Sequence, residues 1–160
     1  MIDRRTLRRM FLSAFDAEGL KYANGGCQLV HKDLKWSISI VVDGSGKRAP
    51  YRLILGASLP QLGDLAPRNA EDCYLFLPLP YGDGEDETEG AIPFIPDAAF
   101  PDWAGENEVR AAAIARCVAQ VIRYAQGVDS SDALRARYVA GDYNGAFIIA
   151  PMRSLLDVGS

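Results

Sequence analysis

The sequence predicts an α+β fold, in which an antiparallel sheet is packed on one face by an N-terminal helix and by C-terminal helices. Apolar residues recur at helical spacing near the start of the chain and again after residue 105, whereas apolar and polar residues alternate between about residues 26 and 58. Seven prolines between residues 59 and 103 exclude a long helix there. At 160 residues the chain is long enough for one self-sufficient core, so we expect a single domain.

The first expected element is a helix over residues 3–18. Asp3 is placed to cap it and Gly19 to end it. Its apolar positions recur every three or four residues and form one buried stripe: Leu7, Met10, Phe11, Ala14 and Phe15.

Three strands of an antiparallel meander are expected next, over about residues 26–31, 35–42 and 50–58. In the second strand every other residue is apolar and shares one face: Trp36, Ile38, Ile40 and Val42. The glycine-rich segment 43–47 is expected to form the turn that follows.

The segment from residue 59 to 104 is expected to be irregular and to wrap over the sheet. Its proline content predicts this, because each interior proline removes a backbone donor and disrupts a helix. The apolar run over residues 73–77 is the one strand expected within it.

Helical periodicity returns over residues 106–126, and a second helix is expected over residues 131–140. The remainder allows two interpretations. Asn144-Gly145 could turn a hairpin, or a last helix could span residues 143–157 with an interruption at Pro151. We favour the helix, because helix-forming residues precede this stretch and apolar residues near its end resume helical spacing.

The formal net charge of −4 conceals two opposed clusters. Residues 1–9 contain four arginines against one aspartate, a net charge of +3: Arg4, Arg5, Arg8 and Arg9. Residues 83–90 contain five acids, a net charge of −5: Asp83, Glu85, Asp86, Glu87 and Glu89. Positive charge at the start of a helix opposes the helix dipole, so helix stability does not explain the arginines. These clusters are the candidate binding residues.

The sequence carries no pattern of a membrane span, a signal peptide or a disulfide framework. The three cysteines, Cys27, Cys73 and Cys117, are widely spaced and fit reduced, packed thiols. We therefore expect a cytoplasmic protein.

No catalytic residue, metal site or cofactor is predicted. Cys27 and His31 are four residues apart on one expected strand, about 13 Å, which is too far for proton transfer. The acidic cluster of residues 83–90 lacks the pattern of a calcium loop and fits a solvated loop better, although a divalent cation remains open. The segment 43–48 connects two strands and does not open a helix, so it is not a phosphate-binding loop.

The N-terminal third resembles small bacterial α+β domains in which a helix precedes an alternating meander. The segments that carry this resemblance are residues 15–20, 28–31, 36–40 and 51–56. Some relatives of those domains are similar to immunity proteins of bacterial toxin systems. The resemblance implies a non-catalytic binding protein and assigns no functional residue.

We expect a non-catalytic domain that binds another protein through charge-complementary surface, with neither nucleic acid nor membrane as partner. A sequence pI of about 5.0 opposes a nucleic-acid module. The alternative is a small-molecule binder or enzyme, with a pocket between the sheet and residues 59–104. Four aromatic residues are the candidate lining: Trp36, Tyr74, Phe94 and Trp103.

Overall fold

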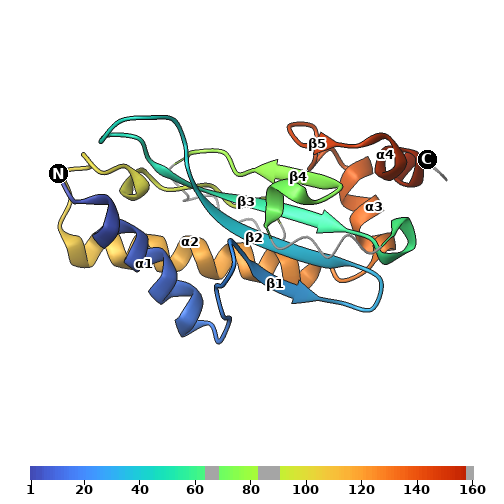
Figure 1. Ribbon diagram of the computed structural model, residues 1–160, viewed down its shortest axis with the longest axis horizontal. Helices are drawn as coiled ribbons and strands as arrows, with labels where there is room; N and C mark the ends of the chain where they lie inside the picture. Colours follow the sequence, from blue (N-terminus) through green and yellow to red (C-terminus); the bar gives the residue numbers. More distant parts are fainter. Residues whose placement is uncertain (64–68, 83–90, 158–160) are drawn as a thin grey trace.

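A computed structural model describes residues 1–63, 69–82 and 91–157 (Figure 1). The five acids of residues 83–90 lie outside this described part. The sheet is an antiparallel meander in the order β1-β2-β3-β4-β5, and its strands are Cys27–Val30, Lys35–Val42, Tyr51–Ser58, Leu75–Pro78 and Phe147–Ile148. Within the described ranges the α-helices are α1 (Arg4–Ala17), α2 (Asn107–Gly127), α3 (Ser131–Val139) and α4 (Ala150–Asp157). The predicted α+β class is confirmed.

Helices α1 and α2 pack against each other and against the same face of the sheet, as Figure 1 shows. Asp3 caps α1 as expected, since its carboxylate accepts a hydrogen bond from the Thr6 backbone N–H at 2.9 Å. The core lies between the helices and the sheet. It is formed by fully buried side chains from all three elements, among them Leu7, Phe11, Phe15, Ile38, Leu53, Leu55, Ile114, Val118 and Val121.

The opposite face of β2 and β3 is covered in part by the backbone around a short 3-10 helix, Ala70–Asp72. Close approach is possible because the sheet residues there are small. A Cβ atom at Gly56 would lie 2.5 Å from the Ala70 carbonyl oxygen. The Ser39 hydroxyl oxygen accepts a hydrogen bond from the Ala70 backbone N–H at 2.8 Å. The expectation of a segment wrapped over the sheet therefore fits the part from residue 69 to 73.

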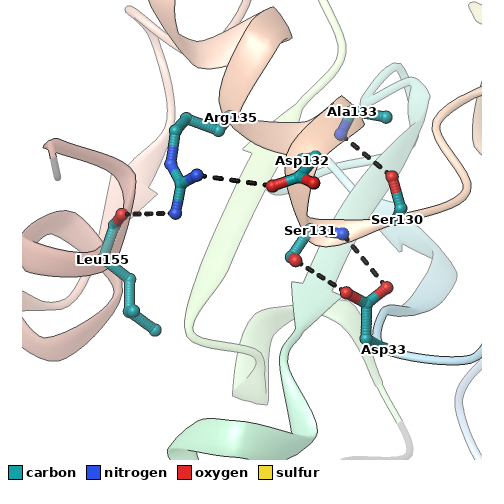
Figure 2. Close-up of polar contacts among 7 residues, drawn as sticks. All are labelled: Asp33, Ser130, Ser131, Asp132, Ala133, Arg135 and Leu155. Atoms are coloured by element: carbon teal, nitrogen blue, oxygen red, sulfur yellow. Dashed lines mark hydrogen bonds and ion pairs between the residues drawn. The ribbon is translucent and has the colours of Figure 1, made fainter. Parts of the chain in front are cut away.

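The turn between β1 and β2 contacts the junction between α2 and α3. The carboxylate of Asp33 accepts hydrogen bonds from the hydroxyl and the backbone N–H of Ser131, at the start of α3 (Figure 2). Ser130, the N-cap, accepts a hydrogen bond from the Ala133 N–H at 3.0 Å. In the same view Arg135 reaches the carbonyl of Leu155 in α4, which joins the last two helices.

The expected helix over residues 143–157 needs correction. Residues 141–145 form turns, residues 147–148 form β5, and α4 begins at Ala150. Gly141 has φ 96°, a conformation that ends α3 and that glycine adopts readily. Pairing of β5 with β4 then outweighs local helix propensity, and the Phe147 and Phe76 rings stack with centroids 4.8 Å apart. Pro151 lies in the first turn of α4, where its missing N–H costs nothing.

Smaller shifts affect the other elements. The fourth strand begins at Leu75 and not at residue 73, because Cys73 ends the 3-10 helix before it. Helix α2 runs one residue further than expected, to Gly127, and α3 ends at Val139. Within the described ranges, no helix is long and apolar enough to cross a membrane.

Candidate functional site

The basic cluster divides into two pairs once α1 is formed. Arg4 is half-buried and faces the β2–β3 turn, where its guanidinium donates a hydrogen bond to the Gly46 carbonyl. Arg8 lies one turn further along the same side, 6.0 Å from the centre of the Tyr22 ring. Arg5 and Arg9 are exposed and lie away from that side, because successive helix residues are rotated by about 100°.

The β2–β3 turn adds two cations to this end of the molecule. Lys47 and Arg48 are exposed and directly follow Gly46, the residue that Arg4 contacts. The Tyr51 hydroxyl also donates to the Arg4 carbonyl oxygen at 3.3 Å, which links β3 to the start of α1. Figure 1 shows the turn beside the N-terminus. We call Arg4, Arg8, Lys47 and Arg48 the turn-side basic patch.

The exposed cations of this region have no carboxylate within ion-pair distance in the part of the chain that the structure describes. There, Arg5, Arg8, Arg9, Lys47 and Arg48 form no ion pair with a carboxylate. Asp3 is the nearest acid in sequence, and it caps α1. The first turn of α1 contains bases and no acid, and its last turn contains an acid and no base. The charges at both ends therefore oppose the helix dipole.

The four aromatic residues expected to line a pocket lie in separate surroundings. Trp36 is fully buried, and its indole N–H donates to the Val128 carbonyl at 2.8 Å. Tyr74 is also buried, and its hydroxyl donates to the Leu62 carbonyl at 3.1 Å. Phe94 is 37% exposed and covers Gly82.

Trp103 lies near the other end of α2 and packs beneath a buried arginine. The Arg110 guanidinium stacks over the Trp103 ring at 5.1 Å and donates to the carbonyls of Ala98, Phe100 and Trp103 at 2.7 to 2.9 Å. About 27 Å of helix separates Arg110 from Val128, beside which Trp36 lies. Trp36 and Trp103 therefore do not converge on one pocket.

A groove is present elsewhere, where α3, β5 and α4 meet. Its volume is about 380 Å³, and it is lined by Tyr138, Val139, Tyr143, Asn144, Ala146, Ile148 and Arg153. The lining combines apolar side chains with the amide of Asn144 and the guanidinium of Arg153. Neither sequence charge nor periodicity indicated this groove, because β5 was not predicted.

A polar network lies behind the groove. The Tyr124 hydroxyl donates to the Asp142 carboxylate at 2.9 Å and lies 2.9 Å from the Tyr143 hydroxyl. The Arg137 guanidinium is 3.8 Å from Asp142. Burial is the main cause that raises the pKa of Tyr124 and of Tyr143 well above the ordinary tyrosine value. Both hydroxyls therefore stay neutral and connect α2 to the turn after α3.

The thiols and the histidine are engaged in packing. Cys27, Cys73 and Cys117 are buried and unpaired, and burial raises the pKa of the Cys117 thiol to about 12. The His31 Nε2 atom donates to the Ala125 carbonyl at 2.9 Å, at the end of α2. In the described parts of the chain, no three His, Cys, Asp or Glu side chains gather as a metal site.

Comparison with family models, with curated proteins and with solved structures finds no match to this chain. The candidate site therefore depends on geometry alone. Sequence reasoning identified the arginines but missed Lys47 and Arg48, which it assigned to a turn. The turn could have indicated them, because a short turn between two strands of a meander lies at one end of the helix-covered sheet.

Proposed function

We propose that this chain is a non-catalytic domain that binds an acidic surface of another protein through the turn-side basic patch. One observation carries the proposal. The hydrogen bond from Arg4 to Gly46 joins the start of α1 to the β2–β3 turn, about forty residues later, and no described carboxylate pairs with Arg8, Lys47 or Arg48. The positive end of the α1 dipole adds to the same field.

Such a surface favours association rate and orientation more than affinity. Exposed ion pairs contribute about 0.2–1 kcal/mol each, whereas complementary fields steer a partner and exclude those of like charge. The resemblance of residues 1–60 to immunity-protein-like domains supports a protein partner. The reduced, buried thiols support a cytoplasmic location.

Fluorescence anisotropy with a labelled oligoglutamate peptide tests this proposal. We expect salt-sensitive binding that is lost in the triple variant Arg8→Glu, Lys47→Glu, Arg48→Glu. A control for charge reversal elsewhere is Arg116→Glu with Arg123→Glu, two exposed arginines on α2. Equal binding by the triple variant would contradict the proposal. Tighter binding of a single-stranded oligonucleotide of similar charge would instead indicate a nucleic-acid partner.

The groove between α3, β5 and α4 favours a second candidate, a binder of small organic acids. Arg153 and Asn144 add donors to a lining that includes the apolar side chains of Ala146 and Ile148. A thermal-shift series with small aliphatic and aromatic carboxylates would show stabilisation that Arg153→Ala removes. No shift across the series would eliminate this candidate.

A further inference from the structure

The outer face of α1 carries a regular stripe that the turn-side basic patch does not include. Arg5, Arg9, Leu12 and Asp16 are spaced by four, three and four residues, so they share one side of the helix. This side is opposite the buried stripe of Leu7, Phe11, Ala14 and Phe15. We call the four residues the outer stripe.

The outer stripe is accessible and has charge of both signs. Arg5, Arg9 and Asp16 are exposed, and Leu12 is half-buried. In the described part of the chain, none of the three charged side chains forms an ion pair. The bases lie in the first half of α1, whereas the acid lies in its last turn.

This order of charges is unfavourable in a single helix and favourable in an antiparallel pair. In one helix, Arg5 lies near the positive end of the dipole and Asp16 near the negative end. If a second α1 lies alongside in the opposite direction, the bases of each helix face the acidic end of the other.

The spacing gives such a pair a definite register. Full overlap of the 14-residue helices places the two-fold axis between residues 10 and 11. Arg5 then lies opposite Asp16 of the second copy, and Arg9 lies opposite Leu12. Asp16 of the second copy lies about 6 Å along the axis from Arg9, within reach of that side chain as well.

We infer that the outer stripe of α1 is a self-complementary interface, and that its occupant is a second copy of this chain in antiparallel orientation. Arg9 and Leu12 supply the centre of the contact, where the aliphatic part of the arginine packs on the leucine. The reciprocal Arg5 and Asp16 pairs flank it. A C2 arrangement repeats each of these contacts twice.

This inference goes beyond the proposed function and leaves the turn residues of its surface free. Lys47 and Arg48 lie in the β2–β3 turn, off α1, whereas Arg8 borders the outer stripe, three residues from Arg5 and four from Leu12. One helix face with a single apolar residue gives a small, polar contact. We therefore expect weak dimerisation that decreases as salt concentration rises.

Sedimentation equilibrium of the full chain over a range of concentrations at low salt tests the inference. We expect a monomer–dimer equilibrium that Asp16→Arg weakens by about tenfold or more, because four like charges then face one another across the axis. Arg5→Asp alone should weaken it similarly. The double variant Arg5→Asp with Asp16→Arg exchanges the two charges and should restore self-association.

Destabilisation of α1 is not expected to cause the loss of self-association, because each substitution places a charge where the helix dipole favours it. Circular dichroism should show unchanged helix content, and the melting temperature should not fall. The matched control is Glu71→Arg, the same charge change at an exposed residue beyond the opposite face of the sheet.

A monomer at every concentration, a dimer unaffected by Asp16→Arg, or a double variant no better than the single variants would overturn the inference. These outcomes differ from a failure of the proposed function. That failure appears in peptide binding by a variant with only Lys47→Glu and Arg48→Glu, two changes outside α1, whose self-association should remain unchanged.

Discussion

The carboxylate of Asp33 accepts two hydrogen bonds from Ser131, which lies 98 residues later in the chain: one from its hydroxyl at 2.6 Å and one from its backbone N–H at 3.1 Å. At the end of α2, His31 of the same turn donates to the Ala125 carbonyl, and Trp36 of β2 donates to the Val128 carbonyl. The β1–β2 turn thus satisfies backbone groups that the break between α2 and α3 leaves without helical partners. These hydrogen bonds join the first strand pair of the sheet to the junction of the two helices.

Replacing Asp33 with alanine should lower the free energy of unfolding by about 1 kcal/mol, the usual cost of a lost helix cap. Urea unfolding followed by circular dichroism measures the change. Asp129→Ala is the matched control, because it removes an exposed carboxylate near the same helix end that has no hydrogen bond to α3 in the described structure. Equal losses of unfolding free energy in both variants would show that the loss of a negative charge, and not the loss of the Asp33 hydrogen bonds, is responsible.

Stability should fall in acid through Asp33 and Asp3. Hydrogen bonds from Ser131 lower the pKa of Asp33, and those from Thr6 lower the pKa of Asp3, both below the ordinary value of 3.8. A carboxylate with a lowered folded pKa stabilises the fold above its unfolded pKa, and this contribution disappears as pH falls through the folded pKa.

The unfolding free energy should therefore decrease as the pH falls below about 5 towards 2, and Asp33→Ala should reduce that decrease. Urea titrations at several acid pH values measure both slopes. Parallel curves for the variant and the natural chain would show that Asp33 does not contribute.

Local periodicity predicted the elements whose burial pattern lies within one segment. The stripe from Leu7 to Phe15 and the alternation of Trp36, Ile38 and Ile40 each specify one buried face, and the structure places those faces in the core. The same reasoning failed where tertiary contacts decide. Phe147 becomes part of a strand because Phe76 lies beside it, and nothing in the local sequence shows that neighbour.

The candidate site likewise combines features that the local sequence shows with features that only tertiary contacts decide. The four arginines are visible as a cluster in the sequence, but their separation into two sides depends on helix phase and on the contact between Arg4 and Gly46. The sequence does not single out Arg110, because an arginine on a helix is usually exposed. Its burial follows from three carbonyls of the preceding segment that turn towards it.

Arg110 is expected to be the most important single side chain for the segment between Ile95 and α2. Its guanidinium donates to three backbone carbonyls, and burial lowers its pKa. Arg110→Ala leaves these acceptors unsatisfied and should cost about 3 kcal/mol. Arg110→Lys should recover little, because one ammonium group does not reproduce the planar fork.

Urea unfolding of Arg110→Ala beside Arg116→Ala measures this effect on two arginines of the same helix. Arg116 is exposed, so its removal should change stability by no more than about 0.5 kcal/mol. A loss below about 1 kcal/mol in Arg110→Ala would mean that water replaces the guanidinium without cost.

Gly56 is expected to control how closely the Ala70–Asp72 turn approaches the sheet. A Cβ atom there would lie 2.5 Å from the Ala70 carbonyl oxygen and 2.6 Å from the Cys73 sulfur, so the backbone would have to move. Gly56→Ala should destabilise the fold by about 1–3 kcal/mol and expose the Cys73 thiol. Reaction with Ellman's reagent under native conditions reports that exposure, with Cys73→Ser in the same background to assign the thiol.

Gly127→Ala, at a helix position with open space, should instead leave thiol reactivity unchanged and raise stability by about 0.5–1 kcal/mol. If Gly56→Ala leaves the Cys73 thiol protected and stability unchanged, the turn is not packed on β3 as closely as these distances require.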